Sequence, residues 1–286
     1  YALDAATTGQ YNVGVGSSAL GLVTTSGNNV AVGTSALAAN TAAENTAIGH
    51  SAAQSNTSGV RIIAIGAGAY DSSDTENDNF AIGYDAMTTN TAGGTGNLAI
   101  GNYTLDALTS GDYNVGVGLN VLSANTTGGN NVAVGQAALL TNTTASDNTA
   151  LGHYALLLNT TGDKNVAVGA LAMDANTTGA DNVAMGYGTL GLNTTGNLNV
   201  AIGKNALTAN TDATSNTAVG SGSMDANTTG AYNTAIGTDS LTENTTGDFN
   251  VALGRAAMQN NNADGNTAIG RNAMYANTTG VRNLAI

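Results

Sequence analysis

A short motif that returns about every 17 residues constrains this chain more than any other feature. When the glycine that ends each [VT]-A-[IV]-G segment is taken as an anchor, sixteen anchors run from Gly16 to Gly270. The interval is 17 residues in all but three cases, where it is 16 or 18. The consensus reads N-[VT]-A-[IV]-G-x-x-A-[LM]-x-x-N-T-T-G-x-x. A unit this short cannot bury an apolar face alone, so neighbouring copies must stack.

The residue types within each repeat predict strands and tight turns. In "NVAVG", Val166 and Val168 point to one side and Ala167 to the other, which is the alternation of a strand. "NTTG" supplies turn residues, because Asn and Gly tolerate a left-handed backbone. The predicted fold is all-β, a parallel β-solenoid with one coil per repeat and about 17 coils. We expect residues 1–286 to form a single repeat domain that is cut within a repeat at both ends, with irregular coils over 67–101.

Three apolar positions recur in each repeat. The residue before the anchor is aliphatic and is expected to form an inner ridge (Val15, Ile48, Leu151, Met185, Ile269). The residue before that one is only Ala or Gly, so another surface must approach it closely. Leu or Met four residues after the anchor is expected to fill the core (Leu37, Leu139, Met173, Leu207, Met258). Both faces of the strand are apolar or small, which favours a homotrimer; a single fully wound solenoid is the alternative.

Two asparagines recur at fixed places in the repeat, and identical amides stacked at the strand spacing can bond to one another as a ladder. The first column precedes the strand and the second follows the Leu or Met. The predicted ladder residues are Asn131, Asn148, Asn165, Asn182, Asn199, Asn216, Asn233 and Asn250 in the first column, and Asn125, Asn142, Asn159, Asn176 and Asn193 in the second. Ile62 is the clear exception in the first column.

The composition excludes several function classes. The net charge is −13 with only six basic residues, which argues against nucleic acid and against docking on anionic lipid. With no cysteine there is no disulfide frame and no thiolate metal site. No apolar stretch is long enough to span a bilayer, so we expect no membrane insertion. No cofactor is expected.

The stretch "DSSDTENDN" is the most irregular and brings Asp71, Asp74, Glu76 and Asp78 together in sequence. Clustered carboxylates can hold Ca²⁺ through several oxygens. The spacing is not that of an EF-hand loop, so a solvated loop is favoured over a weak cation site.

Other motifs give little support for catalysis. "GYGTLG" (Gly186–Gly191) matches a dinucleotide loop, but neither a helix nor the expected acid follows. His50 and His153 have no partner motif and are expected at the surface. Sequons at Asn125, Asn159, Asn176 and Asn244 are better explained by the ladder than by glycosylation. The chain is therefore expected not to be an enzyme; a sugar-cleaving tailspike would need an acid pair in a cleft.

Variable positions beside the strands carry any binding specificity. Their larger occupants are Tyr11, Tyr113, Lys164, Tyr232, Phe249, Arg255 and Arg271. Exposed Tyr and Arg often anchor recognition, although one per coil also suits solubility. An ice-binding face is a minor alternative, because the side chains of adjacent Thr177 and Thr178 diverge.

The segments "NVAVG..AL" and "NTAIG..AM" resemble the head repeats of YadA-like trimeric autotransporter adhesins. The longer "NTAIGRNAMYANTTG" (Asn266–Gly280) is similar to repeats in the shafts of phage tail fibres and bacterial surface fibres. The likeness covers nearly the whole chain, but the added "NTTG" makes the period longer than in adhesin heads. The resemblance implies a left-handed, trimeric parallel β-roll with an adhesive or spacer role.

The expected function is that of a non-enzymatic fibre segment, located outside the cell, on its surface or on a virion, that mediates attachment or acts as a spacer. Its expected partner is a second copy of itself, in a homotrimer or an end-to-end filament, with a cell-surface receptor or a glycan as a further partner. The alternatives are a self-assembling extracellular filament subunit and a solenoid surface that binds a glycan or ice.

Overall fold

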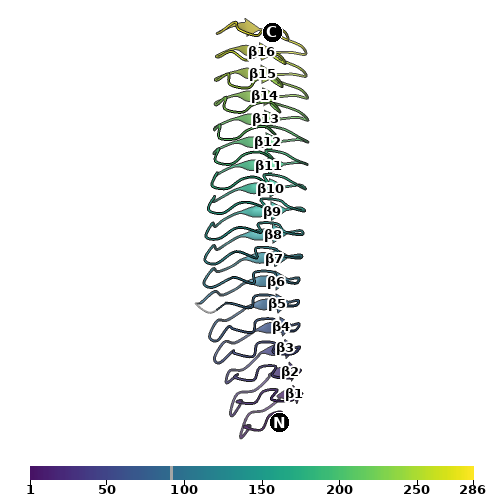
Figure 1. Cartoon of the computed structure of the whole chain (residues 1–286), viewed down its shortest axis with the longest axis vertical. Coiled ribbons are helices and arrows are strands. Elements are labelled where there is room, and N and C mark those ends of the chain that lie inside the picture. The colour runs from purple at the N-terminus through teal and green to yellow at the C-terminus, as the bar shows by residue number, and fades with distance from the viewer. Residues whose placement is uncertain (91–92) are drawn as a thin grey trace. The chain divides into compact units, whose positions relative to one another are not determined.

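The computed structural model describes residues 1–90 and 93–286. The chain divides into two compact units, unit 1 (Tyr1–Ala145) and unit 2 (Ser146–Ile286). The described residues contain no helix, and within each unit every repeat makes one coil of a parallel β-solenoid (Figure 1). The predicted all-β solenoid is confirmed.

Each coil contributes one short strand. Those of unit 1 are β1 (Val13–Val15), β2 (Val30–Val32), β3 (Thr46–Ile48), β4 (Ile63–Ile65), β5 (Phe80–Ile82), β6 (Leu98–Ile100), β7 (Val115–Val117) and β8 (Val132–Val134). Those of unit 2 are β9 (Thr149–Leu151), β10 (Val166–Val168), β11 (Val183–Met185), β12 (Val200–Ile202), β13 (Thr217–Val219), β14 (Thr234–Ile236), β15 (Val251–Leu253), β16 (Thr267–Ile269) and β17 (Leu284–Ala285).

Equivalent residues of successive coils lie in register. Within unit 2, Ala167 of β10 pairs with Ala184 of β11, and Ala184 pairs with Ala201 of β12. The coils of unusual length keep this register: Phe80 of β5 pairs with Leu98 of β6 across the 18-residue interval. The additional or missing residues are therefore accommodated in the turns, and within each unit the equivalent strand positions of successive coils form columns.

The interior of each coil is narrow and is filled by small and unbranched side chains. The central Ala of the strands has no exposed surface, as at Ala167 and Ala201. The Leu or Met four residues after the anchor is also fully buried, which confirms the prediction for Leu37, Leu139, Met173, Leu207 and Met258. A methyl group at Gly116, where most other coils have Ala, would lie 2.7 Å from Thr104 Cγ2, 3.5 Å from Val121 Cγ1 and 3.7 Å from Leu105 Cδ1. The close approach that the Ala face needs comes from the coils of the same chain.

The predicted inner ridge is wrong, because the residue before the anchor points outward. The residues Val15, Ile48, Leu151, Met185 and Ile269 are between 38% and 56% exposed. Alternation along a strand allows only one face to point inward. The face that fits a coil this narrow is the one carrying Ala, so the two flanking aliphatic residues are placed on the outside.

Left-handed backbone occurs in every turn region, but not where "NTTG" predicts it. In the coil of β10, Leu171, Met173 and Asp181 have φ values of 57°, 52° and 57°. The segment Asn176–Gly179 contains no residue with positive φ. Its glycine is required for a different reason: a Cβ at Gly179 would lie 2.5 Å from the carbonyl oxygen of Gly196 in the next coil.

The stretch 67–101 is irregular in its turns and regular in its strands. β5 and β6 keep the parallel register although Gly83 and Gly101 are 18 residues apart. Thr91 and Ala92, within this stretch, lie outside the described residues. The acidic segment 71–78 forms the turn between β4 and β5.

Candidate functional site

The first asparagine column forms a buried ladder through its backbone. In unit 2 the amide N–H of Asn165 donates to Asn148 Oδ1 at 2.9 Å, and that of Asn182 donates to Asn165 Oδ1 at 3.1 Å. In unit 1 both the backbone N–H and Nδ2 of Asn131 donate to Asn114 Oδ1 at 3.1 Å. Each side-chain oxygen thus caps the strand of the next coil.

The second column forms a ladder between side chains. Nδ2 of Asn176 donates to Asn159 Oδ1 at 2.8 Å, and Nδ2 of Asn193 donates to Asn176 Oδ1 at the same distance. In unit 1, Asn142 and Asn125 make the equivalent bond at 3.0 Å. All thirteen predicted ladder residues are buried: Asn131, Asn148, Asn165, Asn182, Asn199, Asn216, Asn233, Asn250, Asn125, Asn142, Asn159, Asn176 and Asn193. The predicted asparagine ladder is confirmed.

In coils that carry both asparagines, such as those of β10 and β11, a shared carbonyl joins the two ladders, a link that the sequence did not indicate. Gly179 O accepts from Asn165 Nδ2 at 2.8 Å and from Asn176 Nδ2 at 2.9 Å. Gly196 O accepts in the same way from Asn182 and Asn193. Because a buried amide left without a partner is destabilising, this repeated acceptor explains why both columns can lie in the core.

The ladder also makes the asparagine side chains of the glycosylation sequons inaccessible to solvent. The side chains of Asn125, Asn159, Asn176 and Asn244 have no exposed surface. Attachment of a sugar needs Nδ2 in solvent, whereas Nδ2 of Asn244 donates to Asn227 Oδ1 at 2.9 Å and to Gly247 O at 3.0 Å. The folded chain cannot carry glycans at these four positions.

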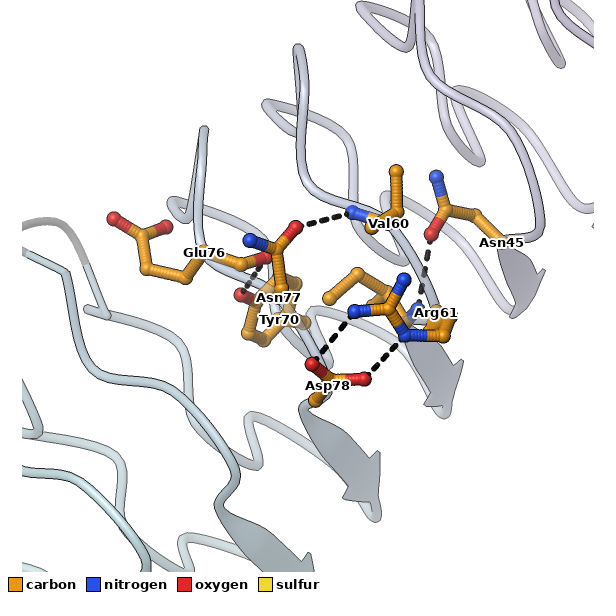
Figure 2. A network of polar contacts seen from close by, with 8 residues as sticks. Asn45, Val60, Arg61, Tyr70, Glu76, Asn77 and Asp78 are labelled. Carbon is orange, nitrogen blue, oxygen red and sulfur yellow. Dashed lines mark hydrogen bonds and ion pairs between the residues drawn. The ribbon is translucent and has the colours of Figure 1, made fainter.

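In the coil of β4 both columns are interrupted, and other groups replace the missing amides (Figure 2). Ile62 replaces the first Asn, yet its backbone N–H still donates to Asn45 Oδ1 at 2.9 Å. Ser73 replaces the second Asn, and Tyr70 occupies the core position of Leu or Met. The Tyr70 hydroxyl accepts from Asn79 Nδ2 at 2.9 Å and donates to Glu76 O at 3.3 Å. Burial raises the pKa of Tyr70 well above its usual range, so the hydroxyl stays protonated.

The four acids of the segment 71–78 point to different partners. Glu76 is buried, and its carboxylate accepts from the backbone N–H groups of Thr75 and Gly93 at 3.1 and 3.0 Å. Asp78 is exposed and pairs with Arg61 of the preceding coil through two hydrogen bonds, the second at 2.8 Å between Asp78 Oδ2 and Arg61 Nη2 (Figure 2). This pairing lowers the pKa of Asp78.

The carboxylates of the remaining two acids, Asp74 and Asp71, take no part in the contacts of Glu76 and Asp78. Asp74 is exposed, and its carbonyl oxygen accepts from the Thr57 N–H at 2.7 Å. Asp71 is half-buried, and burial raises its pKa, with a further contribution from Asp85. Within the part of the chain that the structure describes, no three His, Asp or Glu side chains gather closely enough to hold a metal ion.

The other residues with catalytic potential are isolated. His50 and His153 are exposed, as predicted, and the His153 ring lies against Tyr154. Gly186 of "GYGTLG" directly follows β11 and is succeeded by a turn rather than a helix. These residues do not form an acid–base pair or a phosphate loop.

The outward face of the strands carries exposed apolar side chains in both units. We call the first and third residues of the strands the outer stripe. In unit 2 its better exposed members include Leu151, Met185, Ile202, Ile236, Val251, Leu253 and Ile269. The third strand residue is apolar in every coil from β9 to β16, whereas the first is Thr in β9, β13, β14 and β16.

The corner position, which is the residue before the first Asn of each coil, carries the larger variable side chains. Tyr11, Tyr113, Lys164, Tyr232 and Phe249 are exposed there, and Arg255 and Arg271 are exposed just after their anchors. The hollows of the described surface include one of about 340 Å³ in unit 1, lined by Leu22, Ala38, Ala39, Gln54 and Ser55, and one of about 610 Å³ in unit 2, lined by Phe249, Asp264, Gly265, Val281 and Arg282.

Comparison of the chain with protein-family models, with curated proteins and with solved structures gives no significant match. Across residues 1–90 and 93–286, no helix is long and apolar enough to cross a membrane.

Proposed function

We propose that the chain is a non-enzymatic segment of an extracellular or virion fibre, in which three parallel copies pack through their outer stripes. The observation that carries the proposal is the outward placement of two apolar residues in eleven of the seventeen strands, and of one apolar residue beside a Thr in β3, β9, β13, β14 and β16. These side chains contribute little to the core, because the central Ala and the Leu or Met column already fill it.

The stripe is well suited to contact with an identical copy. It continues from coil to coil in the same register, so two parallel copies present the same spacing to one another. Closed cyclic assembly is the usual outcome for identical chains, and three stripes that meet about one axis would cover all of them. The resemblance to trimeric adhesin heads and fibre shafts supports the same arrangement.

The buried ladders support a mechanical role. Each coil is bonded to the next by backbone hydrogen bonds, by asparagine side chains and by threonine hydroxyls such as that of Thr177, which donates to Thr194 O at 2.9 Å. A chain whose polar interior serves only to connect coils is suited to act as a shaft that holds an adhesive surface or a spacer.

The test is the mass of the purified chain in solution by light scattering, before and after charges are placed on the stripe. Ile202→Lys combined with Ile236→Lys should convert a trimer into monomers, because both side chains would lie at the interface. Thr195→Lys combined with Thr229→Lys adds the same charge at exposed turn positions and should leave the trimer intact. A wild-type monomer would refute the trimer, and open-ended filaments would favour a self-assembling subunit instead.

A further inference from the structure

The residue at the corner position has a left-handed backbone in almost every coil. A residue type that rarely adopts this conformation therefore needs another reason to occupy the position. Asn130, Asp147 and Asp181 have φ values between 57° and 61° there, and Gly265 has 70°. Gly, Asn and Asp adopt this conformation at low cost, whereas bulky side chains do so rarely. Tyr232 and Phe249 nevertheless occupy it in successive coils, with φ values of 58° and 57°.

Both aromatic side chains remain largely exposed, so burial contributes little stability at these two positions. Tyr232 is 56% exposed and Phe249 is 61% exposed. Their rings stack on each other, with centroids 5.2 Å apart and planes inclined by 5°. The stacking holds the Phe249 ring in a fixed orientation beside the coil that follows.

That following coil has a glycine at the corner position, and this opens a hollow beside Phe249. A Cβ placed on Gly265 would have only Arg282 Cγ, at 3.4 Å, as a close neighbour other than backbone. The hollow of about 610 Å³ is lined by Phe249, Asp264, Gly265, Val281 and Arg282. This volume is in the range of sites that take a small ring-shaped ligand.

The polar groups of the hollow are one carboxylate and one guanidinium. Asp264 Oδ1 accepts from the Asp248 N–H at 2.9 Å, which orients the carboxylate. Arg282, from the coil of β17, also lines the hollow. The site therefore offers an aromatic face, an oriented carboxylate acceptor and the N–H donors of a guanidinium.

We propose that this hollow binds a neutral hexopyranose unit of a glycan. The apolar C–H face of the sugar ring packs on Phe249, its hydroxyls donate to Asp264, and its oxygens accept from Arg282. A neutral ring satisfies both charged groups, whereas a phosphate or a nucleotide would face the Asp264 carboxylate in a chain of net charge −13. The inference rests on the proposed fibre function and names the chemistry of its adhesive surface.

The test is saturation-transfer NMR on the whole chain with the methyl glycosides of galactose, glucose, mannose and N-acetylglucosamine as probes. At least one probe should receive saturation at its ring protons. Phe249→Ala should weaken that binding about tenfold or more. Gly265→Asn should do the same by filling the hollow, and it leaves a residue type that tolerates the local backbone. Tyr113→Ala removes an exposed aromatic from another corner position and should not affect binding.

Light scattering on the same samples separates this proposal from the proposed function. No saturation transfer to any of the four sugars overturns the glycan site, even if the chain is trimeric. Unchanged sugar binding in Gly265→Asn overturns it as well, because the sugar would then bind elsewhere. If Phe249→Ala breaks the trimer, the aromatic pair belongs to the interface between copies and the proposal is wrong.

Discussion

The Tyr70 hydroxyl stands where a ladder asparagine is missing, and Asn79 Nδ2 donates to it at 2.9 Å. At the equivalent place between the coils of β15 and β16, the donor Asn266 Nδ2 reaches Asn261 Oδ1 at 3.1 Å. One side chain therefore fills the core position of Leu and also supplies the polar atom that Ser73 is too short to provide.

Removal of the Tyr70 hydroxyl should lower the stability of the folded chain. Tyr70→Phe keeps the ring and leaves one proton of the buried Asn79 amide without an acceptor, although the other still reaches Gly94 O at 2.8 Å. We expect the free energy of unfolding to fall by about 1–2 kcal/mol. Tyr187→Phe, at an exposed tyrosine, should leave it unchanged. Urea titration measures both, and equal stability of the two variants would refute the role of Tyr70.

Leu108 occupies a position of the second column in unit 1 where other coils have Asn. The missing amide can therefore be introduced there by substitution. The Asn90 Oδ1 atom on one side of it is buried without a partner. Leu108→Asn should donate to that oxygen and accept from Asn125 Nδ2, so the loss in stability stays under about 1 kcal/mol. Leu105→Asn, at a core position with no ladder, should cost about 3 kcal/mol. If both variants are equally destabilised, the column does not accept a new amide.

Substitution of the anchor glycine should destabilise the chain far more than substitution of the glycine two residues later. A Cβ at Gly186 would lie 2.7 Å from both Gly203 O and Thr189 Oγ1. Gly186→Ala should therefore cost about 2–4 kcal/mol.

Gly188 provides the matched control for this substitution. It has φ 60°, and the equivalent residues Asn205 and Asp239 have 56° and 53°. Gly188→Asn should change stability by less than about 1 kcal/mol. Thermal denaturation distinguishes the two variants, and a harmless Gly186→Ala would contradict the close contact between coils.

Mild acid should stabilise the chain. Burial raises the pKa of Asp106, Asp174 and Asp225 above the ordinary value. A raised pKa in the folded state means that the folded chain binds protons more tightly than the unfolded chain, so stability increases as the pH falls through the folded pKa values toward about 4. The melting temperature should rise as the pH is lowered from 7 toward about 4, and less so in Asp106→Asn with Asp174→Asn. A melting temperature that falls steadily over this window would show that other groups dominate.

The sequence predicts the stacking and the ladder because a fixed period determines which residues become neighbours. Asn176 lies beside Asn159 in any solenoid with one coil per repeat. The period does not determine which face of a strand points inward, so the prediction that Ile48 and Met185 point into the core is wrong. The inward face is the one whose side chains fit the narrow interior of the coil. In the coil of β10 that interior is filled by Ala167 and Met173.

Features that join different columns are harder to predict. The signal for Tyr70 was present in the sequence, since Tyr replaces Leu in the one coil where Ser73 replaces Asn. The hollow beside Phe249 depends on Gly265 in the next coil and on Arg282 in the coil after it. Only the three-dimensional register brings these residues together.

The central claim is that the outer stripe faces other copies of the chain, and spin labelling tests it directly. The chain has no cysteine, so Ile202→Cys and Thr195→Cys each provide a single labelling site, the first on the stripe and the second in a turn. Pulsed dipolar spectroscopy measures the distances between labels on different copies. Shorter distances from Ile202→Cys than from Thr195→Cys are predicted. The absence of dipolar coupling in Ile202→Cys, or shorter distances from Thr195→Cys, would contradict the account.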